Sequence, residues 1–141
     1  MNFFSTFLLL TILLFNGKND IDPSGIYRSK NNQFERFSEM RINKNGTFIY
    51  KYGLSACQDE ITGKYQVQGK KIKFEKDVEF TKKFLQKQKD SLVKIDSTYK
   101  EMEILEYPEL GVWKLNSKYI KPEVKIDFGC IVIKEKHIKI Y

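Results

Sequence analysis

The side chains that could carry catalysis or bind a metal are few and scattered in this sequence. His137 is the only histidine of the 141-residue chain, and Cys57 and Cys130 are its only cysteines. A cysteine nucleophile needs a base beside it, and zinc sites need several Cys or His ligands at short spacings. The chain has no C-x-x-C pair. The sequence therefore predicts no metal site and no cofactor.

Carboxylate pairs are the other source of acid–base chemistry. Asp59 and Glu60 are adjacent, whereas Glu101 and Glu103 are two residues apart. Residues two apart on a strand share one face, and we expect this face to be turned to solvent. His137 falls in an expected turn, where an exposed side chain is the usual outcome. The sequence thus indicates no catalytic residue and favours a protein that is not an enzyme.

The elements that would position any site are short strands in hairpin order. In MRINKNGTFIY, a three-residue loop over residues 44–46 brings Ile42 opposite Phe48 and Met40 opposite Tyr50. This register puts the large apolar side chains on one face, and it places the glycine of the loop at the left-handed position of a type I turn with a bulge. A two-residue loop would scatter the same side chains over both faces. We therefore expect the longer loop.

A second hairpin is expected in GKYQVQGKKIKF. A two-residue loop of Gln68 and Gly69 would pair Val67 with Lys70 and Tyr65 with Ile72. Apolar side chains would then occupy one face and lysines and glutamines the other, which is typical of a half-buried antiparallel pair.

The C-terminal half gives a weaker pattern. Strands are expected over residues 99–106 and 112–120. In VKIDFGCIVIKEKHIKIY the alternation changes parity at Gly129, which suggests a bulge. A turn at 135–136 would pair Ile133 with Ile138. Residues 77–95, rich in lysine and glutamine, fit either a short surface helix or a strand followed by a loop.

Eight or nine such strands must bury one face and hide their edges, and curling into a small barrel does both. The sequence therefore predicts an all-β fold, an antiparallel meander closed into a barrel, with a short helix or loop around residues 78–95. The motifs GIY, MRINKNGTFIY and GKYQVQGKKIKF resemble the lipocalin-like small secreted β-barrel proteins of Gram-negative bacteria, over Gly25–Phe74 and more weakly to Tyr141. Tyr27 stands where true lipocalins have tryptophan. The resemblance implies this fold, an envelope location and a barrel that can hold a cavity.

The N-terminal residues 1–17 read MNFFSTFLLLTILLFNG and carry no charged side chain. The apolar run is too short to span a bilayer and fits the core of a signal peptide. We expect residues 18–141 to form the mature barrel domain, periplasmic or secreted, with no integral membrane span once the signal is removed. An uncleaved hydrophobic anchor and an N-terminal core segment are the alternatives.

Export bears on the two cysteines, because disulfides persist in oxidising compartments. An even cysteine count in an exported chain predicts one disulfide, between Cys57 and Cys130. Two unpaired buried thiols remain the alternative.

Function at this stage is an expectation of binding. Six aromatic side chains are expected to point into the barrel, where they either fill the interior as a packed core or leave room for a small apolar ligand in the barrel mouth. They are Phe48, Tyr50, Tyr65, Phe74, Trp113 and Phe128. The alternative is a protein-interaction module, such as an immunity or inhibitor protein, whose basic loops bind an acidic partner. The net charge of +7 comes almost wholly from lysine, since the chain has three arginines. Lysine lacks the fork that reads bases, so no nucleic-acid partner is expected.

Overall fold

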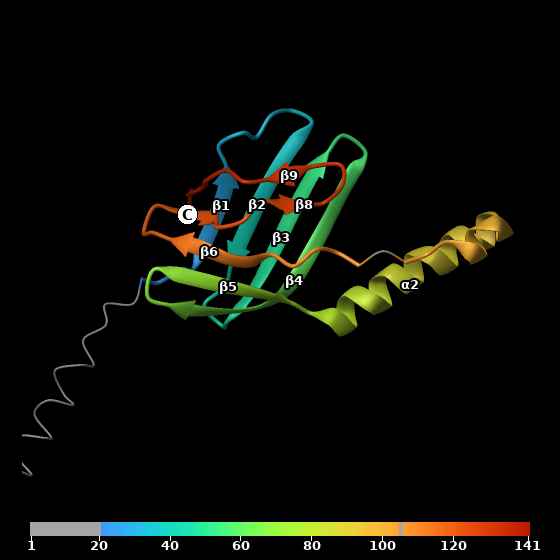
Figure 1. The fold of residues 1–141 in the computed structure, drawn as a ribbon, viewed down its shortest axis with the longest axis horizontal. Helices are drawn as coiled ribbons and strands as arrows, with labels where there is room; N and C mark the ends of the chain where they lie inside the picture. Colours follow the sequence, from blue (N-terminus) through green and yellow to red (C-terminus); the bar gives the residue numbers. More distant parts are fainter. Residues whose placement is uncertain (1–20, 105) are drawn as a thin grey trace, which may run out of the picture.

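A computed structural model of the chain describes residues 21–104 and 106–141, and its centre is a closed antiparallel barrel of eight strands (Figure 1). Neighbouring strands follow the order β1-β10-β7-β6-β5-β4-β3-β2. The barrel strands are β1 (Gly25–Ser29), β2 (Arg36–Ile42), β3 (Thr47–Leu54), β4 (Cys57–Gln68), β5 (Lys71–Lys76), β6 (Gly111–Leu115), β7 (Tyr119–Pro122) and β10 (His137–Lys139). The all-β barrel expected from the sequence is confirmed.

The first hairpin has the expected register. Ile42 lies opposite Phe48 and Met40 opposite Tyr50. Gly46, at a φ of 87°, takes the left-handed position that the three-residue loop requires. The apolar pattern and the turn chemistry therefore agree on one pairing, and both were readable in the sequence.

The second hairpin forms, but its expected register is wrong by two residues. Tyr65 lies opposite Phe74 and Val67 opposite Ile72, with Gly69 and Lys70 in the loop. Gly69 has a φ of 59°. A two-residue loop with glycine first needs a positive φ at that position, whereas the expected loop would have put Gln68 there. Because a shift of two keeps every side chain on its face, the buried face is still as expected.

Two of the expected C-terminal strands are corrected. The segment 99–106 is not a strand: η1 (Ser97–Glu101) is a 3-10 helix, and the residues described after it pair with no strand. The Asp96 side chain accepts from the Thr98 amide at 2.9 Å, which starts this helical turn. The segment 112–120 is not one strand but the hairpin β6–β7. The Asn116 side chain accepts from the Lys118 amide at 2.9 Å, a turn that breaks the run.

The expected turn at 135–136 is also wrong. Ile133 belongs to β9 (Val132–Ile133), which pairs with β8 (Ile126–Asp127) in a separate two-stranded sheet. β10 instead closes the barrel between β1 and β7. Gly129, at a φ of 87°, lies in the β8–β9 turn and not in a bulge. Alternation reveals that a segment is a strand, but an edge of the barrel decides which partner it takes.

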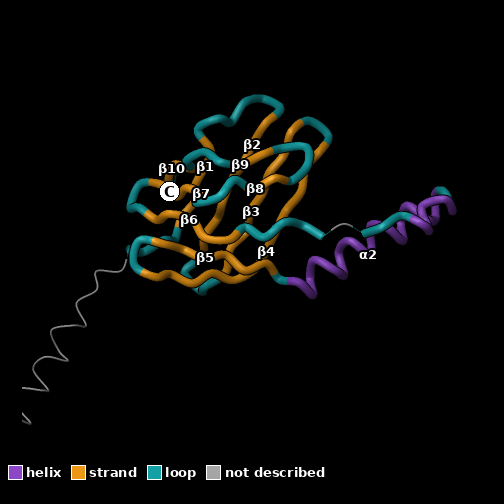
Figure 2. The backbone as a smooth tube through the Cα atoms, in the orientation of Figure 1, coloured by secondary structure: helices purple, strands orange, loops and turns teal. Residues whose placement is uncertain are grey.

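Two insertions leave the same end of the barrel, because successive strands alternate in direction. One follows β7 and carries β8 and β9; we call residues 123–136 the plug. The other follows β5 and carries α2 (Val78–Ile95) and η1; we call residues 77–104 the arm. Figure 1 shows α2 projecting away from the barrel while β8 and β9 stay against it, and Figure 2 shows the chain returning from the helix as a loop.

The arm resolves the choice left open for residues 77–95 in favour of a helix. Asp77 caps it, since its carboxylate accepts from the Phe80 amide at 3.0 Å. Lysine, glutamine and leucine, which fill the helix, are good helix formers. Of the described residues of α2, Thr81 alone is buried.

The core fills the barrel interior. Its buried apolar residues are Tyr27, Met40, Ile42, Phe48, Tyr50, Tyr52, Ile61, Ile72, Phe74, Leu110, Trp113, Leu115, Ile120, Ile126, Ile131 and Ile133. The pairing Cys57–Cys130 is confirmed as a disulfide with a Cα–Cα distance of 6.4 Å. No helix in residues 21–104 and 106–141 is long and apolar enough to cross a membrane. The expected signal peptide, residues 1–17, lies outside the described residues.

Candidate functional site

Ring contacts join five of the six aromatic residues expected to line a ligand site, all except Tyr65. Phe48, Tyr50, Phe74 and Trp113 are fully buried, while Tyr65 and Phe128 are partly buried against the same core. The Phe74 ring meets Phe48 and Trp113 edge-on, with centroids 5.0 and 5.7 Å apart. Edge-to-face contacts at this range are those of a packed aromatic cluster. In this conformation the six side chains occupy the space that a ligand would take.

The plug closes the barrel mouth from which both insertions leave. Ile126, Ile131 and Ile133 are buried in the core from this side. Phe128 stacks on Tyr52 of β3 with ring centroids 3.9 Å apart. The disulfide then ties the plug to Cys57 at the β3–β4 turn, across the mouth from the strands to which the plug is joined. The mouth is thus covered by apolar contacts and held by a covalent bond.

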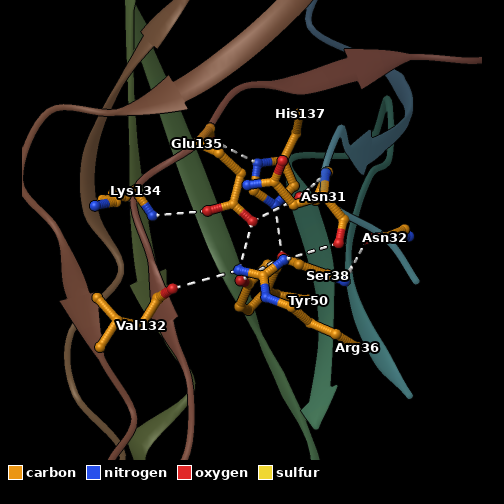
Figure 3. A network of polar contacts seen from close by, with 10 residues as sticks. Asn31, Asn32, Arg36, Ser38, Tyr50, Val132, Lys134, Glu135 and His137 are labelled. Carbon is orange, nitrogen blue, oxygen red and sulfur yellow. Dashed lines mark hydrogen bonds and ion pairs between the residues drawn. The ribbon is translucent and has the colours of Figure 1, made fainter. Parts of the chain in front are cut away.

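A buried chain of polar groups runs under the plug (Figure 3). The Ser38 hydroxyl lies 2.6 Å from the Tyr50 hydroxyl and 2.5 Å from Nε2 of His137. Nδ1 of His137 lies 3.1 Å from the backbone oxygen of Glu135, which can only accept, so Nδ1 carries the proton. Nε2 therefore accepts from Ser38, and Ser38 accepts from Tyr50. Each of these donors has an acceptor when the imidazole is neutral.

The expectation that His137 is an exposed turn residue is wrong, since it is a fully buried residue of β10. Burial lowers the pKa of His137 to about 4, against a smaller raising effect of the Glu135 backbone and carboxylate. Burial also raises the pKa of Tyr50 well above its usual range. Both groups are therefore neutral at pH 7. The barrel needs the histidine neutral, because a second ring proton would take the acceptor from Ser38.

Glu135 is the charged end of this network. Its carboxylate accepts from the Ser29 hydroxyl at 2.6 Å and forms an ion pair with Arg36 at 2.7 Å. Burial alone would raise the pKa of Glu135, but the hydrogen bonds from Ser29, the Lys134 amide and Arg36 outweigh it and lower the pKa to about 2. In Figure 3 Arg36 also reaches the Val132 backbone oxygen. Arg36 thus fastens the plug to β2.

The Ser38–His137 contact has the geometry of a nucleophile beside a base, yet both residues have an exposure of 0%. The hydroxyl is sealed beneath the plug, so the chain does not present it to a substrate in this conformation. Sequence reasoning missed this cluster. The signal was available, because the register that faces Met40 toward Tyr50 also turns Ser38 inward.

The arm presents the opposite kind of surface. Phe80 and Phe84, one helical turn apart, are 53% and 38% exposed and stack with centroids 6.3 Å apart. Ile95 is 81% exposed near the same side of the helix. The lysines of α2 are Lys82, Lys83, Lys87, Lys89 and Lys94. Its acidic residues are Glu79 and Asp90, so the helix carries a surplus of positive charge beside exposed aromatic rings.

Grooves flank the base of the arm. One of about 430 Å³ has walls that include Val78, Leu85 and Ile104, with Lys82 at its side. A second of about 550 Å³ lies between the start of α2 and the outer wall of β3 and β4. Lys76, next to the first groove, is held by the Tyr107 backbone oxygen and by Glu109. These volumes fall in the range of ligand and side-chain pockets.

The chain matches no protein-family model, no curated protein and no solved structure. In the part of the chain that the structure describes, no group of three or more His, Cys, Asp or Glu side chains could hold a metal ion.

Proposed function

We propose that this chain is an exported, lipocalin-like binding protein without catalytic activity, and that it docks onto an acidic protein partner through its arm. The observation that carries the proposal is the pair Phe80 and Phe84, exposed on a helix whose net charge is positive. An exposed apolar stripe beside charged groups is the usual form of a protein-docking surface. The disulfide supports the exported location, because such bonds persist outside the reducing cytosol.

The arm is favoured over a ligand inside the barrel by how each surface is packed. The interior aromatics already contact one another, and the plug covers their mouth. A ligand would have to displace these side chains. A partner on the arm displaces only water, and it gains contact with two aromatic rings that the chain itself leaves uncovered.

We expect the partner to contact the arm through an apolar patch that is surrounded by carboxylates. The lysines of α2 would raise the association rate and select against basic surfaces, while Phe80 and Phe84 would supply the binding energy. An immunity or inhibitor protein works in this way, by covering an acidic surface of its target.

Photo-crosslinking from position 84 tests the proposal. A benzophenone amino acid replaces Phe84 in one variant and Phe34 in a second. Phe34 is a fully exposed phenylalanine on the β1–β2 loop, at the same end of the barrel as the arm but across the ring of strands from β5. The captured protein is then purified, and its affinity is measured for the unmodified chain, for Phe80→Ala/Phe84→Ala and for Phe34→Ala.

The expected result is an acidic protein captured from position 84 only, which binds the double variant at least tenfold more weakly and Phe34→Ala unchanged. Its affinity should also fall with salt. Equal affinity for all three proteins would rule out the arm as the docking surface.

A further inference from the structure

Lysines form a row across the outer wall of the barrel, over neighbouring strands from β5 to β1. Lys71 of β5 lies directly opposite Lys114 of β6, and Lys114 lies directly opposite Lys121 of β7. Lys136 comes next around the wall, since it precedes His137, the partner of Ile120. Its backbone oxygen accepts from the Lys30 amide at 3.3 Å, which brings β1 to the same level. We call Lys71, Lys114, Lys121, Lys136 and Lys30 the lysine row.

The row holds positive charge that the protein leaves largely unbalanced. Of the salt bridges among the described residues, one involves the row, Lys71 with Glu123 at 3.0 Å. The ammonium of Lys136 lies 4.3 Å from the centroid of the Tyr119 ring, which steadies it at the wall. Like charges directly opposite on neighbouring strands destabilise a sheet. A row that costs stability and has little local compensation points to a use outside the fold.

We infer that the lysine row binds a linear polyanion, and that this polyanion is an acidic polysaccharide with one carboxylate on each repeating unit. Neighbouring strands are about 4.8 Å apart, so the row offers one ammonium at each such step. This spacing is comparable to the length of one sugar unit in a chain. The polymer would lie across the strands and place successive carboxylates on successive lysines.

The composition of the row argues against other partners. Protein interfaces have an apolar centre and are depleted in lysine, whereas the row has lysine at its centre. Single-stranded nucleic acid needs aromatic rings for stacking, and arginine is the residue that forks onto phosphates. The row contains no arginine, and Tyr119, the ring beside it, is covered by Lys136. Lysine point charges suit a flexible polymer that is bound through its charge alone.

Binding of polygalacturonate oligomers to the purified chain tests the inference, with fluorescence anisotropy as the readout. Single-stranded DNA and vesicles containing an anionic phospholipid serve as the other polyanions. The test variant is Lys114→Gln/Lys121→Gln. The matched control is Lys82→Gln/Lys83→Gln on the arm, which removes the same charge at another place. All four lysines lie on the surface, so both variants should keep the melting temperature of the parent chain.

The expected result is polygalacturonate binding that weakens with salt and falls roughly ten- to thirtyfold in the row variant, because each lysine near an anionic surface contributes about 1 kcal/mol. The arm variant should stay within twofold of the parent chain. An equal loss in both variants would reduce the effect to net charge and overturn the inference. Tighter binding of DNA or vesicles would overturn the polysaccharide assignment. These measurements contain no protein partner, so neither result bears on docking through the arm.

Discussion

The plug and the arm leave the same end of one barrel, yet they are held in opposite ways. The plug buries three isoleucines, stacks Phe128 on Tyr52 and ends in a carboxylate fastened by Arg36. The arm is the longer insertion, but its helix buries one residue, Thr81. Both are fixed to the barrel by their ends, so the difference lies in their side chains.

This difference separates stability from recognition. The plug buries its isoleucines in the core, so these apolar side chains are not exposed to a partner. The arm leaves aromatic rings partly exposed to solvent, and it forms its helix from capping and local propensity. We therefore expect changes in the plug to act on the free energy of unfolding, and changes in the arm to act on binding.

Loss of the disulfide should give the largest effect. Cys57→Ala/Cys130→Ala opens a covalent loop that spans a sequence separation of 73 residues. A loop of this size is worth roughly 4 kcal/mol in the chain-entropy account. The measurement is the free energy of unfolding in urea, for the variant and for the oxidised parent chain. An unchanged urea midpoint would mean that the non-covalent contacts alone hold the plug.

A matched pair of isoleucines gives the sharpest contrast between the two regions. Ile133 in the plug is fully buried, whereas Ile95 at the end of α2 is 81% exposed. Ile133→Ala should destabilise the chain by about 3 kcal/mol, because it leaves a cavity in a packed core. Ile95→Ala should change the free energy of unfolding by less than about 0.5 kcal/mol. Urea unfolding of both variants measures the difference, and similar losses would show that the arm is packed more tightly than its exposure implies.

The sequence predicted the barrel well because local rules decide it. The alternation around Met40 and Tyr50, with Gly46 in the turn, allows a single sensible pairing. The plug was not predicted because the apolar residues on both sides of positions 135–136 alternate as they would in a single hairpin that pairs Ile133 with Ile138. Only the closure of the barrel, in which β10 pairs with both β1 and β7, shows that the two residues belong to different sheets.

The candidate sites divide along the same line. The buried aromatics Phe48 and Trp113 were expected from parity, since facing inward is a local property. The Ser38–His137 contact joins residues 99 positions apart, and no short-range pattern reports such a distance. The exposed face of α2 was missed because a lysine-rich stretch with few apolar residues fits a loop as well as a helix.

Acid should lower the free energy of unfolding by protonating a histidine at the junction of the plug and the barrel. The folded-state pKa of His137, about 4, lies below its ordinary value of 6.5, so the folded chain prefers the neutral imidazole. The stability that this provides is complete above about pH 6.5 and is lost as the pH falls toward 4. Between pH 7.5 and pH 5 the free energy of unfolding should drop by about 2 kcal/mol.

Glu135 should affect the free energy of unfolding in a lower pH range than His137. Its pKa of about 2 lies below the ordinary 4.5, so its contribution is present above pH 4.5 and is lost as the pH falls toward 2. Urea unfolding at pH 7.5, 5 and 3 follows both groups, because the step from pH 7.5 to 5 belongs to His137 and the step from pH 5 to 3 combines the end of its titration with that of Glu135. The variant His137→Gln should flatten the first step and reduce the second to the part that Glu135 contributes. A flat profile from pH 7.5 to 5 in the parent chain would contradict the buried neutral histidine.

Removal of the whole arm should have only a small effect on stability, and it completes the comparison. Residues 78–103 are replaced by a short Gly/Ser linker, which can bridge the gap because Lys76 and Ile104 line the same groove. Leu110, Trp113 and the plug are retained, and among the described residues none of those that form the apolar core or pack against it belongs to the arm. The melting temperature should shift by no more than about 4 °C, the change that roughly 1 kcal/mol produces in a domain of this size. The near-ultraviolet circular dichroism of the packed aromatics should persist, while the helical far-ultraviolet signal disappears. If the barrel instead unfolds, the arm contributes to the stability of the barrel, and the contrast between a stabilising plug and a binding arm fails.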